Sequence, residues 1–519
     1  MVNTANPYME SIERNLPRIF ALFDTDRSSS SYGYGDRFYW SWGLIDFGNG
    51  SFQGIAHGFA RLLEANLLPK WVSESAIIER IDAMFIGAKM LTRQDGSLEE
   101  AFPYEGSYCV TALVAFDLIS CIDLLVNRLE PSTIVRYTDI VRPMVSYLLV
   151  ADEHHAFISN HLATAVAALF KWEKITGEGT SERAQVILDR IISNQSHEGW
   201  YLEYDGADPG YQSLCCYYLS DALETTRDDR LKTSLIQSME FLQYFVHPDG
   251  SYGGLYGSRN TRFYYPAGFE YLALDCNLVS QLTVFMRESV EQNLVVGLDS
   301  IDEPNLAPMF NCYCWAAELC NRKSNIPNDM SLPCLSKDEF QIHFKDAGLL
   351  IDRRSSNYTI VSLHKGGVLY HFNQGKLDNL DTGKFFLDDK KHGFTTQNYC
   401  HDNEYTIANG VVSVTSQIRP VPKRLFRPWQ MIVLRVLNIT VMRHYWLREF
   451  IKKVLVKILI TRNGKKVGQN IRNITLGTDL HIEDTYKVVN ESIELQKGVN
   501  QFVSIHMASK GYWQKQDTE

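Results

Sequence analysis

The 519-residue sequence predicts an α+β protein with an N-terminal (α/α) helical toroid over residues 1–330 and an antiparallel β-sandwich over residues 340–519. Apolar residues recur at three- and four-residue steps in the first part, whereas short β-rich runs fill the second. The loops of the helical part also resemble one another. A chain of this length exceeds one ordinary hydrophobic core, so we expect at least two domains.

Helical periodicity runs from about residue 50 to residue 325, and strand-like alternation is nearly absent there. The expected helical segments are Phe52–Leu67, Ala76–Met90, Tyr108–Leu129, Ile140–Leu149, Leu162–Ile175, Arg183–Ile192, Leu214–Leu223, Leu231–Phe245 and Leu272–Met286.

Three loops between these segments share a pattern in which a glycine precedes aromatic or acidic residues. Their glycines are Gly96, Gly199 and Gly250, and the spacings are close to multiples of about fifty residues. Fifty residues is about one antiparallel helix pair, and a fixed period of this size indicates a helical repeat array. We therefore expect helix pairs arranged as a toroid, with these loops gathered at one end around a cleft.

The pattern changes near residue 335, after a linker that contains Pro327 and Pro333. Short β-rich runs separated by Gly, Asn and Asp follow, which is typical of an antiparallel sandwich. The expected strands are Leu349–Ile351, Tyr358–Leu363, Val368–Phe372, Val411–Ser416, Ile471–Leu476, Leu480–Ile482 and Phe502–Met507.

A basic segment, 419–466, interrupts the predicted sandwich. It holds thirteen Lys and Arg residues and a single acid, Glu449, and Val433–Met442 and Phe450–Leu459 look helical and amphipathic. Such a helical insertion inside an acidic protein needs a partner, and we expect peripheral contact with an anionic membrane. The alternative is a helical hairpin packed on the sandwich, with its cations solvated or attracting an anionic polymer.

Composition narrows the function classes. The chain is 45% hydrophobic and 22% charged, with a net charge of −10, which argues against a nucleic-acid partner. Met1–Leu16 lacks the pattern of a signal peptide, and no uninterrupted apolar run reaches about 18 residues. The ten cysteines form no Cys-x-x-Cys zinc pattern. We expect a cytoplasmic protein with reduced thiols, in peripheral contact with the inner membrane, and we expect no cofactor or metal.

The loop 199–211 is the strongest candidate for a binding site. It crowds Glu203, Asp205 and Asp208 together with three tyrosines, and aromatic faces beside carboxylates suit a sugar-binding cleft. The alternative is a tight turn whose tyrosines pack on the core. Trp40 belongs to another aromatic stretch, 32–46, which is either a sugar platform or a plug at the end of the helical domain. The predicted substrate-binding residues are Trp40, Tyr104, Glu105, Glu203, Tyr204, Asp208 and Tyr264.

Four short motifs occur in a suggestive order. Asn160-His161 opens a helix, Tyr211 closes the next loop, and the sandwich begins with Phe344-Lys-Asp-Ala-Gly348, followed by Leu363-His-Lys-Gly-Gly367. This order resembles the heparinase II/III-like polysaccharide lyases over roughly residues 75–415. The resemblance implies an Asn-His pair and a Tyr in the catalytic cleft, together with a histidine of the sandwich. His364 is the candidate for that histidine, although the family's His-Ala-Asp stretch is absent and His371 and His401 lie nearby in the sequence.

The chemistry of a uronate lyase explains these residue types. Elimination removes the proton at C5, α to a carboxylate, and expels the glycosidic oxygen at C4. An amide N–H of Asn160 or a histidine would stabilise the developing charge on the carboxylate. Tyr211 would act as base, acid or both, provided that cationic neighbours lower its pKa, and His161 is the other titratable candidate. The catalytic candidates are therefore Asn160, His161, Tyr211 and His364.

Other interpretations remain open at this point. Asn160 is also a good N-cap, and His161 could be a partly exposed polar residue. His154 and His155 beside Asp152 and Glu153 hint at a metal, although a solvated turn explains them equally well. The alternative functions are a glycoside hydrolase that pairs Glu105 with Glu203 or Asp208, a uronate C5-epimerase beside polysaccharide synthesis, and a non-catalytic polysaccharide-binding protein.

Overall fold

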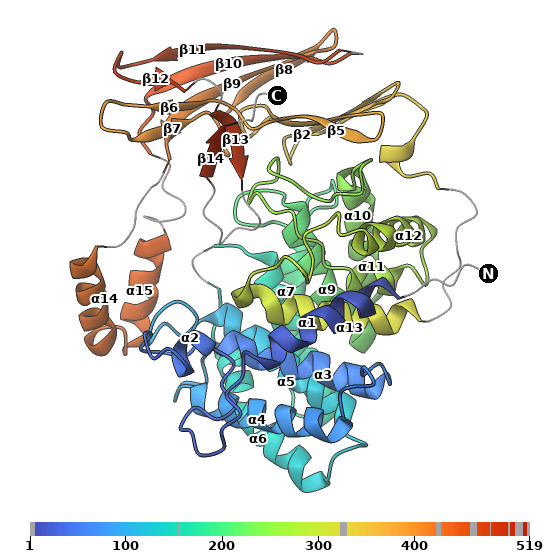
Figure 1. The fold of residues 1–519 in the computed structure, drawn as a ribbon, viewed down its shortest axis with the longest axis vertical. Coiled ribbons are helices and arrows are strands. Elements are labelled where there is room, and N and C mark those ends of the chain that lie inside the picture. The colour runs from blue at the N-terminus through green and yellow to red at the C-terminus, as the bar shows by residue number, and fades with distance from the viewer. Residues whose placement is uncertain are drawn as a thin grey trace.

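The computed structural model describes residues 6–153, 156–321, 330–421, 427–456, 464–477, 479–496, 499–503 and 512–515. Helices make up the first part of the chain and antiparallel sheets the second (Figure 1). This order confirms the prediction of a helical part followed by antiparallel strands.

Six of the described helices form a closed inner ring. Each packs against the next in chain order, and the last packs against the first. We call these helices the ring: α3 (Ile55–Glu64), α5 (Tyr108–Leu125), α7 (Ser159–Thr176), α9 (Pro209–Thr226), α11 (Ala267–Leu272) and α13 (Leu306–Cys320).

A second set of helices covers the ring from outside, each packed on a ring neighbour. These are α1 (Pro7–Phe20), α4 (Glu74–Leu91), α6 (Pro131–Val150), α8 (Ser181–Ser193), α10 (Asp229–Leu242) and α12 (Asn277–Glu291). Shorter elements are α2 (Arg37–Trp40) and the 3₁₀ turns η1 (Gly50–Gly54), η2 (Gln243–Phe245), η3 (Glu303–Asn305) and η4 (Pro333–Leu335). The segment predicted as one helix over Leu272–Met286 is interrupted, because α11 ends at Leu272 and α12 begins at Asn277.

The three glycine loops share one local structure. In each, the backbone N–H three residues before the glycine donates to the carbonyl one residue after it, from Arg93, Ser196 and His247 respectively. Gly96, Gly199 and Gly250 all have positive φ, between 83° and 98°. Only glycine adopts this conformation without strain, which explains its recurrence in these loops.

A five-stranded antiparallel sheet lies next to one end of the ring (Figure 1). Its strands follow chain order: β1 (Phe340–Phe344), β2 (Leu349–Arg354), β3 (Asn357–Ser362), β4 (Val368–Asn373) and β5 (Lys376–Asp381). One face packs on helical residues, and Phe344 contacts Phe241 and Phe245 at ring-centroid distances of 5.0 and 6.2 Å. The central strands β3 and β4 are buried on both faces.

The second sheet covers the far face of the first. Its order is β11-β10-β9-β7-β6-β12, with β8 paired to β9. Val361 and Leu369 of the first sheet share a buried cluster with Val414 and Ile474 of the second. The strands are β6 (Phe385–Leu387), β7 (Gly393–Thr395), β8 (Glu404–Ala408), β9 (Val411–Pro420), β10 (Gly468–Thr475), β11 (His481–Val488) and β12 (Glu494–Leu495), and β13 (Val499–Val503) pairs separately with β14 (Tyr512–Lys515).

The helices α14 (Pro428–Thr440) and α15 (Tyr445–Val456) lie between β9 and β10 in the sequence, and we call this pair the insertion. In space it lies beside the helical part, near α2, and away from the sheets (Figure 1). The alternative of a hairpin packed on the sandwich is therefore wrong, because the insertion's described ion pairs reach Asp46 and Asp95 of the helical part.

The most apolar helix and most of the buried cysteines belong to the ring. Among the described residues, α5 alone is long and apolar enough to cross a membrane by length and composition, but 78% of that window is buried inside the protein. All ten cysteines are free thiols, as the sequence predicts.

Candidate functional site

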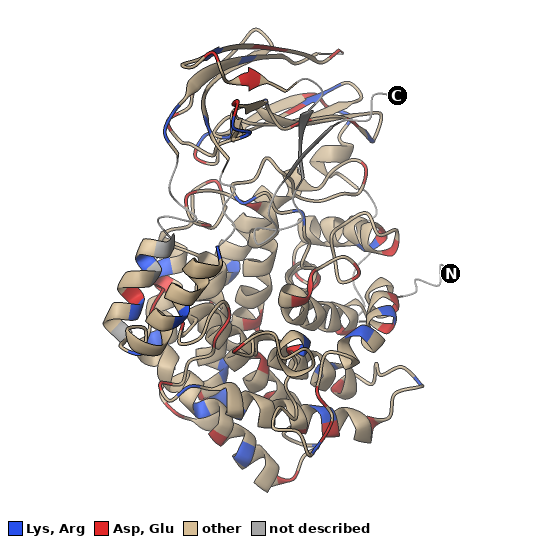
Figure 2. Ribbon diagram, turned by 60° about the vertical axis from the view of Figure 1, so that its left-hand side comes forward, with Lys and Arg blue, Asp and Glu red and all other residues tan. Residues whose placement is uncertain are grey.

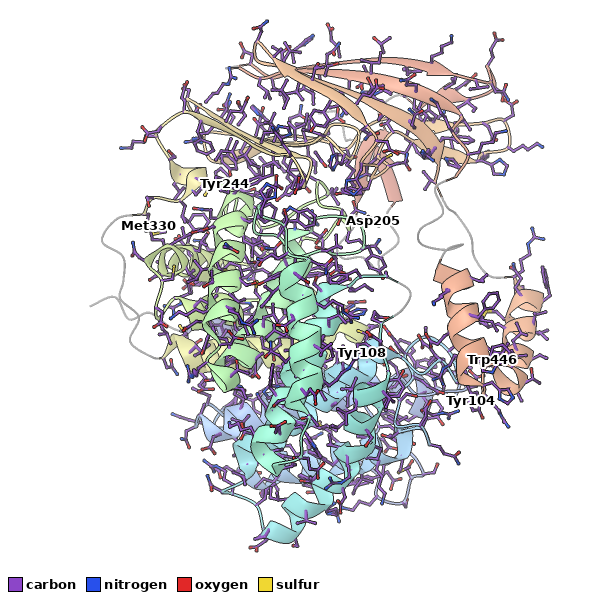
Figure 3. The ribbon with its side chains drawn as sticks, turned by 180° about the vertical axis from the view of Figure 1, so that it is seen from behind. Tyr104, Tyr108, Asp205, Tyr244, Met330 and Trp446 are labelled. Atoms are coloured by element: carbon purple, nitrogen blue, oxygen red, sulfur yellow. The ribbon has the colours of Figure 1, made fainter. Side chains whose placement is uncertain are left out.

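The loop 199–211 lies at the end of the ring that faces the sheets, and Figure 3 shows Asp205 there. It pairs with the segment just before α7: the Ser159 N–H donates to the carbonyl of Leu202, and the Tyr204 N–H donates to that of Phe157. These contacts place Asn160, in the first turn of α7, beside Glu203. The N-cap position belongs to Ile158, so the alternative of Asn160 as an N-cap is wrong.

Glu203 has the most unusual environment of the acidic residues in this loop. Asn160 Nδ2 donates to its Oε2 at 2.9 Å, and its buried Oε1 has no hydrogen-bond partner among the described residues. Burial raises the pKa of Glu203 to about 7, although His161, Asn160 and Arg259 favour the ionised form. The carboxyl group therefore exchanges a proton near neutral pH, as a general acid or base must.

Two tyrosines and an arginine surround this carboxyl group. Arg259 Cζ lies 4.1 Å from the ring centroid of Tyr204, and the half-buried Tyr211 packs edge-on against Phe263. Burial, together with Glu203, raises the pKa of Tyr211 well above its ordinary value, and Arg259 only partly offsets this. The phenol of Tyr211 is therefore neutral at physiological pH. We call Asn160, Glu203, Tyr204, Tyr211 and Arg259 the Glu203 cluster.

His161 lies next to this cluster and is held by a different carboxylate. Its Nδ1 is 2.7 Å from Glu153 Oε2. Burial disfavours its charged form, but Cys109 and Glu153 outweigh burial and hold the pKa of His161 well above the ordinary range. A histidine that is protonated at neutral pH supplies positive charge, so the role of His161 as a base is not supported.

Asp208 anchors the loop. Its side chain caps α9 by accepting from the Tyr211 N–H at 3.2 Å, and it also accepts from the Arg259 N–H at 2.9 Å. Thr261 donates to it from both hydroxyl and backbone. With 1% of its surface exposed, Asp208 positions Arg259 and Tyr211, and its oxygens have little capacity left for a substrate.

The first sheet contributes a lysine to the same loop system. Lys365 Nζ donates to the carbonyls of Leu255 and Gly257, both at 2.6 Å, and to the side chain of Asn260. Burial and Arg259 lower the pKa of Lys365 to about 7, against the opposing effect of Asp208. The sheet thereby holds the turn that carries Arg259.

His364, the predicted catalytic histidine, lines a cavity of about 490 Å³. The cavity lies between the loop 199–211 and the sheets, and Asn194, Ser196, Trp200, Lys345, Asp346, His364 and His401 line it. The His364 and His401 rings are 4.8 Å apart. Burial, followed by His401, lowers the pKa of His364 to about 4, so the imidazole is neutral. None of its described contacts reaches the Glu203 cluster.

The other predicted substrate residues lie elsewhere. Trp40 donates its indole N–H to the carbonyl of Leu22, and Glu105 accepts from the N–H groups of its own loop at residues 100 and 101. Tyr104 lies between two arginines beside the insertion. The prediction for Tyr264 is wrong, because its side chain is 0% exposed and packs in the core against Tyr252.

Sequence reasoning missed Arg259 and Lys365. Arg259 belongs to the polar turn 257–262, which has no recognisable motif and meets Tyr204 only through the fold. Lys365 belongs to the stretch 363–367, next to His364. The signal in the sequence is a lysine followed by two glycines, and both Gly366 and Gly367 have positive φ in the structure.

One group among the described residues brings three potential metal ligands together, namely His197, Glu198 and Asp346. The Glu198 carboxylate already accepts from the N–H groups of Asp346 and Ala347 and from the indole of Trp200. We therefore interpret this group as a contact that fastens the first sheet to the loop 199–211. His154 and His155, the other metal candidates, lie outside the described residues.

No family model matches the sequence, and no curated protein matches it.

Solved structures with a related arrangement exist at low similarity. Xanthan lyase from Paenibacillus aligns with a TM-score of 0.45 at 10% identity, over 80% of this chain and 44% of that one, so this chain spans less than half of that enzyme. Chondroitin AC lyase from Streptomyces coelicolor A3, in complex with chondroitin sulphate, gives a TM-score of 0.49 at 9% identity, over 81% and 67%. Cellobiose 2-epimerase from Bacillus thermoamylovorans B4167 gives 0.43 at 11% identity, over 60% and 99%.

Proposed function

We propose that this protein is a carbohydrate-active enzyme that cleaves an acidic, uronate-containing polysaccharide by β-elimination at the Glu203 cluster. One observation carries the proposal: a carboxyl group with a pKa of about 7 lies in one cluster with a neutral phenol and a guanidinium. These are the base, the acid and the charge-stabilising group that the reaction requires. We interpret the ring and the two sheets as the toroid and sandwich of a polysaccharide lyase of the heparinase II/III-like kind.

The geometry suggests a role for each group. Arg259 is half-buried and has no ion pair with a carboxylate among the described residues, so its guanidinium is available to neutralise the uronate carboxylate. Glu203, ionised, takes the C5 proton. Tyr211 then donates its phenolic proton to the glycosidic oxygen at C4 as the C4–O bond breaks and the C4–C5 double bond forms. Asn160 orients Glu203 through the 2.9 Å hydrogen bond.

This assignment changes two sequence-based expectations. We assign Asn160 a positioning role, because one of its two amide N–H groups donates to Glu203. Tyr211 serves as the acid, because its raised pKa keeps the phenol protonated at neutral pH and leaves almost no phenolate to act as a base.

Hydrolysis is the second candidate. A glutamic acid with a pKa of about 7 also suits the general acid of a glycoside hydrolase. The second carboxylate that such a reaction needs is less evident, because Asp208 already accepts four hydrogen bonds. This occupancy favours elimination.

A panel of uronate polysaccharides tests the proposal. Elimination leaves a double bond conjugated to a carboxylate, so ultraviolet absorbance should rise with wild-type protein and stay flat with Tyr211→Phe. New reducing ends without absorbance would establish hydrolysis, and deuterium incorporation at C5 without cleavage would establish epimerisation. Binding without any of these products would overturn the enzymatic proposal in favour of a polysaccharide-binding protein.

A further inference from the structure

The insertion has an unusual distribution of side chains. Nine large hydrophobic residues are exposed on its two short helices: Trp429, Met431, Ile432, Val433, Val436, Ile439, Trp446, Phe450 and Val454. Their exposed fractions reach 65% at Ile432 and 69% at Trp446. Most of them recur at three- or four-residue steps along each helix, so each helix presents an apolar stripe to the surroundings.

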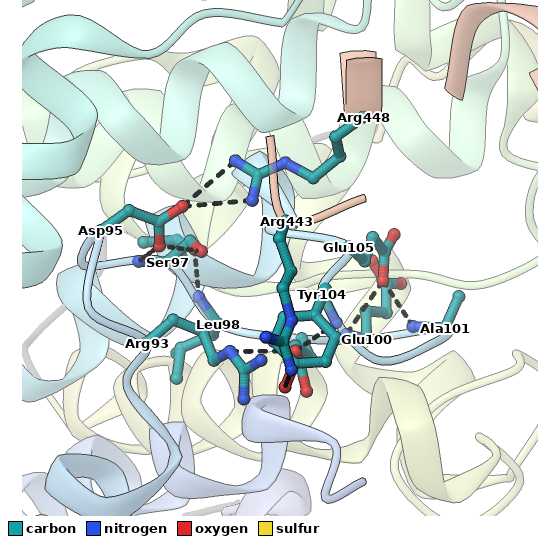
Figure 4. A network of polar contacts seen from close by, with 12 residues as sticks. Arg93, Asp95, Ser97, Leu98, Glu100, Ala101, Tyr104, Glu105, Arg443 and Arg448 are labelled. Carbon is teal, nitrogen blue, oxygen red and sulfur yellow. Dashed lines mark hydrogen bonds and ion pairs between the residues drawn. The ribbon is translucent and has the colours of Figure 1, made fainter. Parts of the chain in front are cut away.

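Cations of the insertion contact the helical part. Arg435 Nε lies 2.8 Å from Asp46 Oδ2, and two N–H groups of Arg448 donate to Asp95 Oδ2 at 3.1 and 3.2 Å (Figure 4). Arg443 donates to the hydroxyl of Tyr104 at 3.3 Å. An ordinary surface helix exposes its charged residues, whereas here Arg448 is buried and nine large apolar residues are exposed.

The apolar surface has neighbours of the same kind. The segment 37–47 lies beside α14, where Arg435 also contacts the ring of Phe47, and it exposes Phe38, Trp42 and Leu44 by 56%, 65% and 82%. Figure 2 shows that the charged residues drawn on α14 and α15 are mostly basic. Arg427 and Lys453 are exposed there and suit anionic headgroups.

We propose that the insertion docks this protein on a lipid bilayer by burying the apolar stripes of α14 and α15 in the interface. Tryptophans with aliphatic neighbours are typical of membrane-interface segments. The helices have 13 and 12 residues, or about 20 Å each, which is too short for a hydrocarbon core of about 30 Å. They therefore lie in the interface and do not span the membrane. This proposal is independent of the reaction at the Glu203 cluster.

The structure also changes the expected character of binding. Arg435, Arg443 and Arg448 are engaged by the helical part, so apolar burial contributes more to binding than charge does. We therefore expect binding to neutral vesicles as well as anionic ones, and little release at ~0.5 M salt, where electrostatic attraction is screened within a few ångströms. A docked enzyme would then meet its polymer at the membrane surface.

Co-sedimentation of the full chain with phosphatidylcholine vesicles, with and without an anionic lipid, tests the proposal. Wild-type protein should sediment with both, and Trp446→Ser/Phe450→Ser should lower the bound fraction at least tenfold. Trp71→Ser is the matched control, because Trp71 is 57% exposed on another surface. Circular dichroism and thermal unfolding check that the double variant is folded.

Three results would overturn the proposal. The first is wild-type protein that stays in the supernatant with both vesicles. The second is wild-type protein that binds anionic vesicles alone and is released from them by salt. The third is a dimer, seen by light scattering without lipid, that the double variant dissociates, since a second copy would then cover this surface.

Discussion

The first sheet and the insertion both come from the second half of the chain and both contact the helical part, but they do so in opposite ways. The sheet buries aromatic side chains against helical residues and adds buried polar contacts from Lys365. The insertion forms ion pairs with the helical part through arginines and leaves nine large apolar residues exposed. A buried apolar contact fixes the position of a site, whereas an exposed apolar surface is suited to binding a partner. Catalysis should therefore depend on the first contact and not on the second.

The largest effect expected on the sheet side of this comparison comes from Glu203→Gln. This change removes the proposed base while keeping an acceptor for Asn160, so kcat should fall by about 10³-fold, within the usual range for acid–base catalysts. The rate of absorbance increase under saturating substrate measures it. Asp205→Asn is the control, since Asp205 is an exposed carboxylate in the same loop. Equal losses in both variants would contradict a specific role for Glu203.

The pH dependence of kcat/KM tests whether Glu203 is the base. Because the base must be ionised and the pKa of Glu203 is about 7, kcat/KM should rise about tenfold per pH unit below that value and level off above it. The pKa of Tyr211 is raised, so the decline expected from loss of the acid falls beyond the usual alkaline range. A profile that falls between pH 6 and 8 would mean that the proton-accepting group is elsewhere.

The raised pKa of Glu203 also makes the stability of the fold depend on pH. Unfolding returns Glu203 to its ordinary pKa of about 4.3, so its contribution is most favourable below about pH 4.3 and is lost as pH rises through about 7. Above pH 7 the ionised, buried carboxylate destabilises the fold by roughly 4 kcal/mol. Glu203→Gln should therefore raise the Tm in alkaline buffer while it abolishes activity. A variant less stable than wild type at pH 9 would contradict the raised pKa.

Lys365→Met tests the contact between sheet and site. The change leaves three acceptors of the turn 255–260 without their donor, so Arg259 should lose its position. We expect kcat/KM to fall about tenfold, mainly through KM, with partial rescue by Lys365→Arg. Lys345→Met is the control, because Lys345 lines the cavity of His364. A lower Tm without any change in KM would show that the role of Lys365 is purely structural.

The sequence predicted the parts of the fold that follow from local periodicity. The glycine loops are the clearest example, since the repeated pattern at Gly96, Gly199 and Gly250 corresponds to one repeated loop structure with positive φ at each glycine. The last ring helix, Leu306–Cys320, was missed because nearly all of its residues are buried, so it has no polar face to set a period.

Of the candidate site, the sequence predicted only the residues that lie in the single loop 199–211. Glu203, Tyr204 and Tyr211 lie within nine residues, and their pattern was visible in the sequence. Arg259 reaches them through the fold, and the turn that carries it is held by Lys365 from a sheet more than a hundred residues later. His364 was proposed from a family resemblance alone. The structure places it beside His401 in a cavity that Trp200 of the same loop also lines, and its catalytic role stays a prediction.

The smallest effect is expected where the insertion contacts the helical part. Arg448 is 94% buried at its side chain, yet its described partner Asp95 is 42% exposed, so Arg448→Ala should loosen α15 without unfolding the ring. Limited proteolysis should cut within 428–456 several-fold faster, while kcat/KM on a soluble oligosaccharide stays unchanged. Arg427→Ala is the control, because Arg427 is exposed at the start of α14. A fall in kcat/KM with Arg448→Ala would show that the insertion also shapes the Glu203 cluster, and the contrast between the two contacts would then fail.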